Sequence, residues 1–293
     1  MGDEHRVLGS GTTGSSKVAR VGVEAARQAL QSAIREACSA AAVNTREISQ
    51  ACIGIAGASR NEVVEAACEW AAELIGGKVQ VIGDMEVALE AAHGGDAGII
   101  VIAGTGSICF GRNQEGQTAR AGGAGPIVSD EGSGDWIGRA AVQEALRNPG
   151  DDRLLAALMK WLRVRTPAEL KGKTEANPPP DFAALFPAVQ AAASEGHRDA
   201  SELLSRAGEE LAKLAHTVIR QLWPKPERVR VGLAGGVLEN SAIVRQTFVT
   251  RLRADLEPTG YRVAISLGAT EPVIGALSLA RKMAPVSAKG RGH

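Results

Sequence analysis

Aromatic side chains are scarce in this sequence. Phenylalanine, tryptophan and tyrosine together account for 3% of the 293 residues, whereas hydrophobic residues of all kinds account for 44%. A chain of this length can bury a large core and commonly forms one large domain or two of ordinary size. Because so few aromatic rings are available, we expect alanine, valine, leucine and isoleucine to build that core.

The sequence also lacks an excess of charge of either sign. Lysine and arginine number 33, as do aspartate and glutamate, so the charge gives no support for binding to nucleic acid or to an anionic membrane. No apolar run reaches the roughly 18 residues of a transmembrane helix, and the N-terminus lacks the apolar region of a signal peptide. We therefore expect a soluble cytoplasmic protein with neither a nucleic-acid nor a membrane partner.

The cysteines do not form a recognisable metal or disulfide pattern. Cys38, Cys52, Cys68 and Cys109 are scattered among apolar neighbours, and no two of them form a CxxC pair. This arrangement is typical of buried thiols in a reducing compartment.

Short apolar runs that end in glycine alternate with segments of helical period. Strands buried on both faces that alternate with helices predict an α/β fold. A hairpin is expected over 109–123, turning near Glu115 and Gly116, and the proline-rich stretch 171–182 is expected to be irregular. The expected strands are 50–57, 78–84, 97–104, 228–236 and 261–266, and the expected helices are 21–42, 60–77, 85–95, 133–146, 152–164, 182–195, 197–222, 239–256 and 271–284.

Glycine turns and one carboxylate follow the expected strands. One strand ends in Asp84, another leads into the turn 104–107, and a third leads into Gly235 and Gly236. Ligands of open α/β sheets bind beyond the carboxyl ends of strands, and glycine lets backbone amides approach an anion. A carboxylate beside phosphate loops needs a role such as accepting a proton. The combination favours phosphoryl transfer.

Each of these features also has a simpler structural explanation. The sequence Gly104-Thr105-Gly106 could be only a hairpin turn. Asp84 could simply cap the following helix, and the pair Gly235-Gly236 could be an ordinary strand-to-helix turn.

A competing motif lies near the N-terminus. Gly9, Gly11 and Gly14 match the G-x-G-x-x-G fingerprint of dinucleotide sites, and Glu36 follows at a suitable distance. The preceding segment is short and polar, whereas the first strand of a dinucleotide-binding fold is buried. The match is therefore weak.

The most distinctive segment is RAGGAGPIVSDEGSGDWIGRAA, residues 120–141. It places Asp130 and Glu131 between glycine turns, and its simpler explanation is a solvated loop with Ser133 as helix cap. This segment resembles the glycine-rich loop of N-acetylglucosamine kinases and the related BadF/BadG/BcrA/BcrD ATPases of the actin/hexokinase/Hsp70-like superfamily. GIAG, VIGDMEVAL, IAGTGSICFG and LAGGVLEN follow the family's order, so the resemblance covers nearly the whole chain.

The resemblance implies a two-lobed actin/hexokinase-like (ribonuclease H-like) ATPase fold. The first lobe would comprise residues 1–94 joined by a C-terminal helix, 271–293, and the second lobe, 95–270, would carry the nucleotide and sugar loops. The implied activity is ATP-dependent phosphorylation of the 6-hydroxyl of N-acetylglucosamine or glucosamine, with Mg²⁺ and a homodimeric assembly.

Residue roles follow from the same resemblance. Asp84 matches the catalytic aspartate that binds the sugar and removes the proton from its 6-hydroxyl. The positions that match nucleotide contacts are Gly104, Thr105, Gly106, Ser107, Gly235 and Gly236, and those that match sugar contacts are Asp84, Gly123, Ala124, Gly125, Asp130 and Lys17.

The sequence departs from the family pattern in places. The family opens with a strand and an Asp-Gly-Gly-Gly-Thr-x-Thr phosphate loop that is not found here, so we expect an incomplete N-terminal lobe, through either a truncated start or lost catalysis. Lys17 stands where the family usually has asparagine, and Ala124 where some relatives have tryptophan, which leaves the sugar open. The alternatives are a non-catalytic amino-sugar-binding protein and, less supported by the scattered cysteines, an ATPase that activates a radical dehydratase.

Overall fold

The computed structural model describes residues 6–16, 18–58, 60–147, 152–268 and 271–283. The chain divides into two compact units, one comprising Met1–Gly95 with Thr270–His293 and the other Asp96–Ala269.

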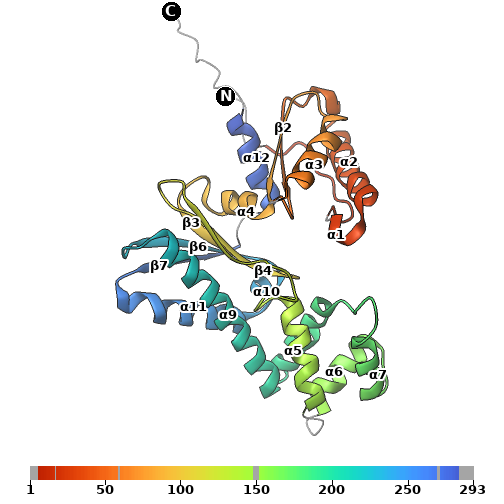
Figure 1. The fold of residues 1–293 in the computed structure, drawn as a ribbon, viewed down its shortest axis with the longest axis vertical. Coiled ribbons are helices and arrows are strands. Elements are labelled where there is room, and N and C mark those ends of the chain that lie inside the picture. Colours follow the sequence, from red (N-terminus) through yellow and green to blue (C-terminus); the bar gives the residue numbers. More distant parts are fainter. Residues whose placement is uncertain (1–5, 17, 59, 148–151, 269–270, 284–293) are drawn as a thin grey trace, which may run out of the picture. The chain divides into compact units, whose positions relative to one another are not determined.

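The first unit contains a parallel pair of strands and the helices that cover it. β1 pairs with β2 from Gln50 opposite Lys78 to Ile55 opposite Gly83. The last helix, α12, returns to this unit from the far end of the chain and packs on α4 and β1 (Figure 1). The elements are α1 (Val18–Val21), α2 (Val23–Ala40), η1 (Thr45–Glu47), β1 (Gln50–Ile55), α3 (Asn61–Ala72), β2 (Lys78–Gly83), α4 (Asp84–His93) and α12 (Pro272–Met283).

The glycine-rich stretch near the N-terminus runs along helix α2. The amide of Thr12 donates to Glu36 Oε2 (3.1 Å), and the hydroxyl of Thr13 donates to the carbonyl of Ala29 (2.8 Å). Within residues 6–16 there is no strand. The motif therefore packs on the side of α2, and the described residues that precede it, 6–8, do not form the buried strand that leads into a dinucleotide loop.

The second unit is built on a five-stranded sheet with the order β5-β4-β3-β6-β7. β3, β6 and β7 are parallel to one another, and β4 runs antiparallel to β3 and β5. The elements are β3 (Gly98–Ala103), β4 (Ser107–Arg112), β5 (Thr118–Gly122), α5 (Gly134–Arg147), α6 (Asp152–Leu162), α7 (Pro167–Thr174), η2 (Phe182–Leu185), α8 (Phe186–Ser194), α9 (Arg198–Leu222), β6 (Arg228–Ala234), α10 (Gly236–Asn240), α11 (Ala242–Leu256), η3 (Glu257–Thr259) and β7 (Arg262–Leu267).

Helix α9 organises the core of the second unit. It packs on β3, β4 and β5, and α11 lies alongside it (Figure 1). Its buried face is aliphatic, including Leu203, Leu204, Leu211 and Val218, all at most 1% exposed. A core of this composition agrees with the scarcity of aromatic residues in the sequence.

The predicted α/β fold is confirmed, and every expected strand is present. The hairpin over 109–123 forms between β4 and β5 and turns at Gly116, which has a positive φ of 78°.

Two local predictions are wrong. Helix α7 enters the stretch expected to be irregular, because Thr166 caps its N-terminus and proline occupies its first turn. The helix expected over 239–256 is two helices, because Ser241 ends α10 and its hydroxyl accepts the amide of Val244 at the start of α11.

Candidate active site

The turn between β3 and β4 is a tight hairpin connection. Ala103 pairs with Ser107 across the two strands, and the amide of Gly104 donates to the carbonyl of Gly106 (2.9 Å). The hairpin explanation of Gly104-Thr105-Gly106 is therefore correct as far as the backbone is concerned.

The N-terminus of α5 holds the carbonyls of this turn. The amide of Gly134 donates to the carbonyl of Gly104 (2.8 Å), and that of Asp135 to the carbonyl of Thr105 (3.2 Å). The C=O and N–H of a trans peptide point in opposite directions, so the amides of Thr105 and Gly106 point away from α5. Neither donates to another group among the residues that the structure describes. Two adjacent outward amides are suited to binding a phosphate oxygen.

Ser107 is engaged differently from its neighbours in the turn. Its amide donates to Asp130 Oδ1 (3.2 Å), and its hydroxyl donates to the carbonyl of Glu131 (2.7 Å). Ser107 is itself buried. In this geometry it ties the turn to the loop that precedes α5, and a phosphate contact for Ser107 remains a prediction.

Side chains of the loop before α5 themselves help to hold its conformation. Asp130 is 7% exposed and has a positive φ of 70°. The hydroxyl of Ser133 accepts the amide of Trp136 (3.1 Å), which agrees with the expected cap. The carboxylate of Asp130 faces the backbone of the β3–β4 turn, and its predicted sugar contact remains a prediction.

The glycine-rich loop that follows β5 lies beside the same turn. Gly122 pairs with Ile108, the residue that follows Ser107. Gly123 and Ala124 are exposed, and Gly125 has a positive φ of 92° with open space around its Cα. These three predicted sugar positions are therefore accessible, close to the candidate phosphate turn.

The turn between β6 and α10 packs against the end of β3. Gly235 has φ 95° and ψ 152°, a region that is essentially restricted to glycine. A Cβ at this position would lie 2.5 Å from the carbonyl oxygen of Ala103, whereas a Cβ at Gly236 would make only an ordinary contact, 3.8 Å from Nδ2 of Asn240. The structure thus brings together the predicted nucleotide turns and the glycine-rich loop at one end of the second unit's sheet.

Asp84 lies in the first unit, at the carboxyl end of β2. It is the first residue of α4, the N-cap position belongs to Gly83, and the amide of Gly83 donates to Glu86 Oε1 (3.1 Å). The Asp84 carboxylate accepts only the adjacent amide of Met85 (3.0 Å) among the described partners, and the residue is exposed. The capping explanation of Asp84 is therefore wrong, and its carboxylate is accessible.

One predicted sugar-contacting residue falls outside the part of the chain that the structure describes. Lys17 lies outside the described residues. Across the described ranges, no group of three or more histidine, cysteine, aspartate or glutamate side chains could hold a metal ion. No helix in the same ranges is long and apolar enough to span a membrane.

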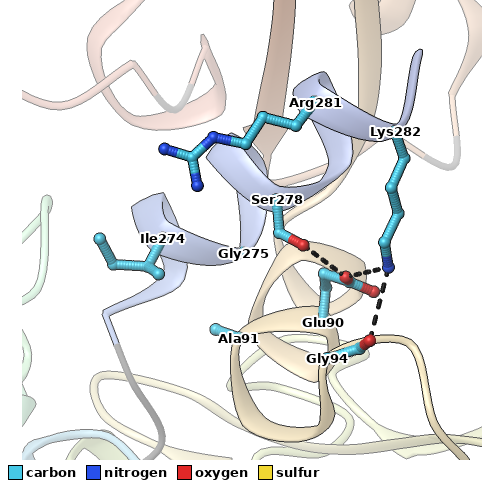
Figure 2. A pocket seen from close by; sticks show the side chains of 8 residues that line it. All are labelled: Glu90, Ala91, Gly94, Ile274, Gly275, Ser278, Arg281 and Lys282. Carbon is cyan, nitrogen blue, oxygen red and sulfur yellow. Dashed lines mark hydrogen bonds and ion pairs between the residues drawn. The ribbon is translucent and has the colours of Figure 1, made fainter. Parts of the chain in front are cut away.

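A separate hollow of about 460 Å³ lies between α4 and α12 of the first unit (Figure 2). On its wall the buried carboxylate of Glu90 accepts the hydroxyl of Ser278 (2.8 Å) and the ammonium of Lys282. These contacts fasten α12 to α4 across 188 and 192 residues of sequence. No sequence signal pointed to them, because the partners lie far apart in the sequence.

Comparison with known proteins decides the family. Residues 1–280 match the BadF/BadG/BcrA/BcrD ATPase family. The chain belongs to this family. A protein from Clostridium acetobutylicum, an N-acetylmuramic acid/N-acetylglucosamine kinase, is 33% identical over 250 residues, which cover 81% of this chain and 80% of the relative. An N-acetyl-D-glucosamine kinase from Dictyostelium discoideum is 28% identical over 243 residues, covering 78% and 74% respectively.

Solved structures agree with this membership of the BadF/BadG/BcrA/BcrD ATPase family. A Chromobacterium violaceum protein with the provisional name N-acetylglucosamine kinase is 28% identical, with a TM-score of 0.72 over 93% of this chain and 90% of that one. A ROK family hexokinase from Thermus thermophilus, 16% identical with a TM-score of 0.55 over 88% and 86%, shares the fold. The predicted family, its actin/hexokinase-like fold and its sugar-kinase class are confirmed.

Proposed function

We propose that this chain is an ATP-dependent kinase that phosphorylates the 6-hydroxyl of an amino sugar. The observation that carries the proposal is the meeting, at one end of the second unit's sheet, of an amide-presenting turn, a Gly-Gly turn and an exposed glycine-rich loop. The first candidate acceptors are N-acetylglucosamine and N-acetylmuramic acid, because the C. acetobutylicum relative carries both in its name. Glucosamine is the next candidate.

The nucleotide would be bound mainly through backbone groups. The amides of Thr105 and Gly106 point away from α5 and would donate to phosphate oxygens of ATP. Gly235 and Gly236 would border the adenosine. Catalysis of phosphoryl transfer depends largely on such positioning and on charge stabilisation.

Asp84 would act as the general base. A sugar hydroxyl is a weak nucleophile, and a carboxylate in hydrogen-bond reach orients and deprotonates it. The sugar oxygen then bonds to the γ-phosphorus, the bond from that phosphorus to the departing ADP oxygen breaks, and the proton passes to Asp84. The exposed carboxylate at the start of α4 is accessible for this role.

Mg²⁺ would accompany the nucleotide and offset charge on its β- and γ-phosphates. This ion usually keeps several water ligands and uses one or two carboxylates plus phosphate oxygens. Such binding needs no dedicated protein cage.

The test is an assay of phosphate transfer from ATP to candidate sugars. The reaction is measured by the release of ADP, and the sugar phosphate is isolated as the product. Asp84→Asn should lower turnover by about 100-fold or more and leave calorimetric binding of sugar and ATP nearly unchanged. The matched control is Glu62→Gln, which removes the exposed first-turn acid of α3 in the same unit and should retain activity. Full activity in Asp84→Asn would refute the base assignment. Sugar binding by the wild type without ATP binding or turnover would support a non-catalytic binding protein instead.

A further inference from the structure

Asp130 lies behind the candidate phosphate turn in a closely fitted arrangement. Its Oδ1 accepts the amide of Ser107 (3.2 Å), and a Cβ added to Gly106 would come within 2.9 Å of its Oδ2. The residue is 7% exposed and left-handed in backbone conformation, with φ 70°. Aspartate and asparagine tolerate that conformation better than most residues. Turn and carboxylate are thus in direct contact.

The three peptide units of the turn are held by different groups. Helix α5 binds the carbonyls of Gly104 and Thr105, which orients the first two peptides. The third peptide joins Gly106 to Ser107. Its carbonyl accepts the amide of Gly104 (2.9 Å), and its amide donates to Asp130. Asp130 therefore provides the side-chain anchor for the peptide that α5 does not hold.

We propose that Asp130 is a positioning residue for the nucleotide. Its carboxylate fixes the Gly106–Ser107 peptide, and the fixed peptide keeps the amides of Thr105 and Gly106 aimed at one phosphate. This role rests on the proposed function of the turn and differs from the sugar contact that the family resemblance implies for the same residue. A carboxylate that binds a backbone amide strongly is suited to such a role, because charge-assisted hydrogen bonds are among the stronger ones.

Two substitutions distinguish the effect of the Asp130 carboxylate from the effect of the left-handed backbone conformation at this position. Asp130→Gly keeps the left-handed conformation accessible and removes the acceptor, and should weaken ATP and ADP binding by about tenfold or more. Asp130→Asn keeps both an oxygen acceptor and tolerance of positive φ, and should retain most of the affinity. Glu115→Gln, at the exposed tip of the β4–β5 hairpin, is the control and should bind nucleotide as the wild type does.

The measurements are calorimetric Kd values for ADP and for the sugar, and KM for ATP against KM for the sugar. The expected result is a larger loss for nucleotide than for sugar in Asp130→Gly, with rescue in Asp130→Asn. Unchanged nucleotide affinity in Asp130→Gly, or a loss confined to the sugar, would overturn the positioning role and leave the kinase proposal intact. A wild type without nucleotide affinity would overturn both proposals.

A second variant changes the turn side of the contact between Gly106 and Asp130. Gly106→Ala places a methyl group against the Asp130 carboxylate and should weaken nucleotide binding in the wild-type background. In the Asp130→Gly background that methyl group has no carboxylate to displace, so the further loss should be smaller. Strictly additive losses in the double variant would contradict the proposal, because residues in contact are expected to couple.

Discussion

Strand β3 of the second unit is buried along nearly all of its length, whereas β1 of the first unit is only partly covered. The second unit packs one large hydrophobic cluster, mostly aliphatic, around its sheet. The cluster around Ile55, Ala67 and Val81 in the first unit is much smaller. The first unit also depends on a helix from the opposite end of the chain. In the second unit, turns pack through their backbone on a large core. In the first unit, side-chain contacts hold α12 on a small core.

The two units should therefore differ in how they respond to perturbation. Local unfolding follows the local density of buried apolar contacts, so we expect the first unit to open at lower free energy than the second. A single melting temperature would not describe such a molecule well, and hydrogen exchange read separately for each unit is the suitable measurement.

The largest expected effect concerns the β6–α10 turn of the second unit. Gly235→Ala should lower the free energy of unfolding by about 3 kcal/mol, because a Cβ would meet the backbone of Ala103 in a conformation that alanine rarely adopts. A Cβ at the neighbouring Gly236 would make only an ordinary contact with Asn240, so Gly236→Ala should change stability by less than about 0.5 kcal/mol. Denaturant unfolding of both variants checks this. Equal losses of unfolding free energy in the two variants would show that packing against the backbone of Ala103 does not determine the stability of this turn.

The next effect concerns the attachment of α12 to the first unit. Lys282→Met removes the cationic partner seen for the Glu90 carboxylate, whose side chain is only 2% exposed. The loss should be about 1–2 kcal/mol, since Lys282 is half exposed and solvent screens part of the pair. Faster exchange should appear in α4 and α12 (Figure 2). Lys171→Met, which breaks the exposed pair with Glu175, is the control and should change little.

Thiol labelling compares the two cores directly. Burial raises the pKa of the Cys109 thiol in β4. Burial also raises the pKa values of the Cys52 and Cys68 thiols in the first unit, which are only partly buried. A thiol reagent should modify Cys52 and Cys68 before Cys109, because thiolate and access are both required. Peptide mapping over a time course identifies each site. Labelling of Cys109 first would contradict a more stable second unit.

The smallest effect is expected at the surface of the first unit. Hydrogen bonds from Arg27 and Gln31 lower the pKa of Glu73 below its usual 4.5. A lowered pKa in the folded state stabilises it above pH 4.5, and that contribution is lost as the pH falls through the folded value. Arg27→Ala should flatten this acid dependence by slightly lowering the free energy of unfolding at pH 7 and leaving it unchanged near pH 2. The change should be small, because salt and solvent screen the exposed pair. Unfolding curves from pH 2 to pH 7 test the slope, and an unchanged slope would refute the assignment.

Short-range patterns in the sequence determined most of the secondary structure of this protein. Alternation of apolar runs and helical periods predicted the strands, the β4–β5 hairpin and the central helices, since each depends on neighbours within a few residues. The motifs around Gly104 and Asp130 were also sufficient to predict the family. The two misjudged segments depended on caps, where Thr166 starts a helix and Ser241 divides one.

Only the tertiary structure decided how those pieces act on one another. The bond from Ser107 to Asp130 spans 23 residues, the turn at Gly235 meets Ala103 from a distant strand, and Lys282 reaches Glu90 across 192 residues. None of these contacts leaves a periodic signal, because side chains far apart in sequence become neighbours only when the sheet and its helices have packed. The same reason explains why Ser107, a member of the predicted phosphate turn, is engaged by Asp130 and Glu131 in the folded chain.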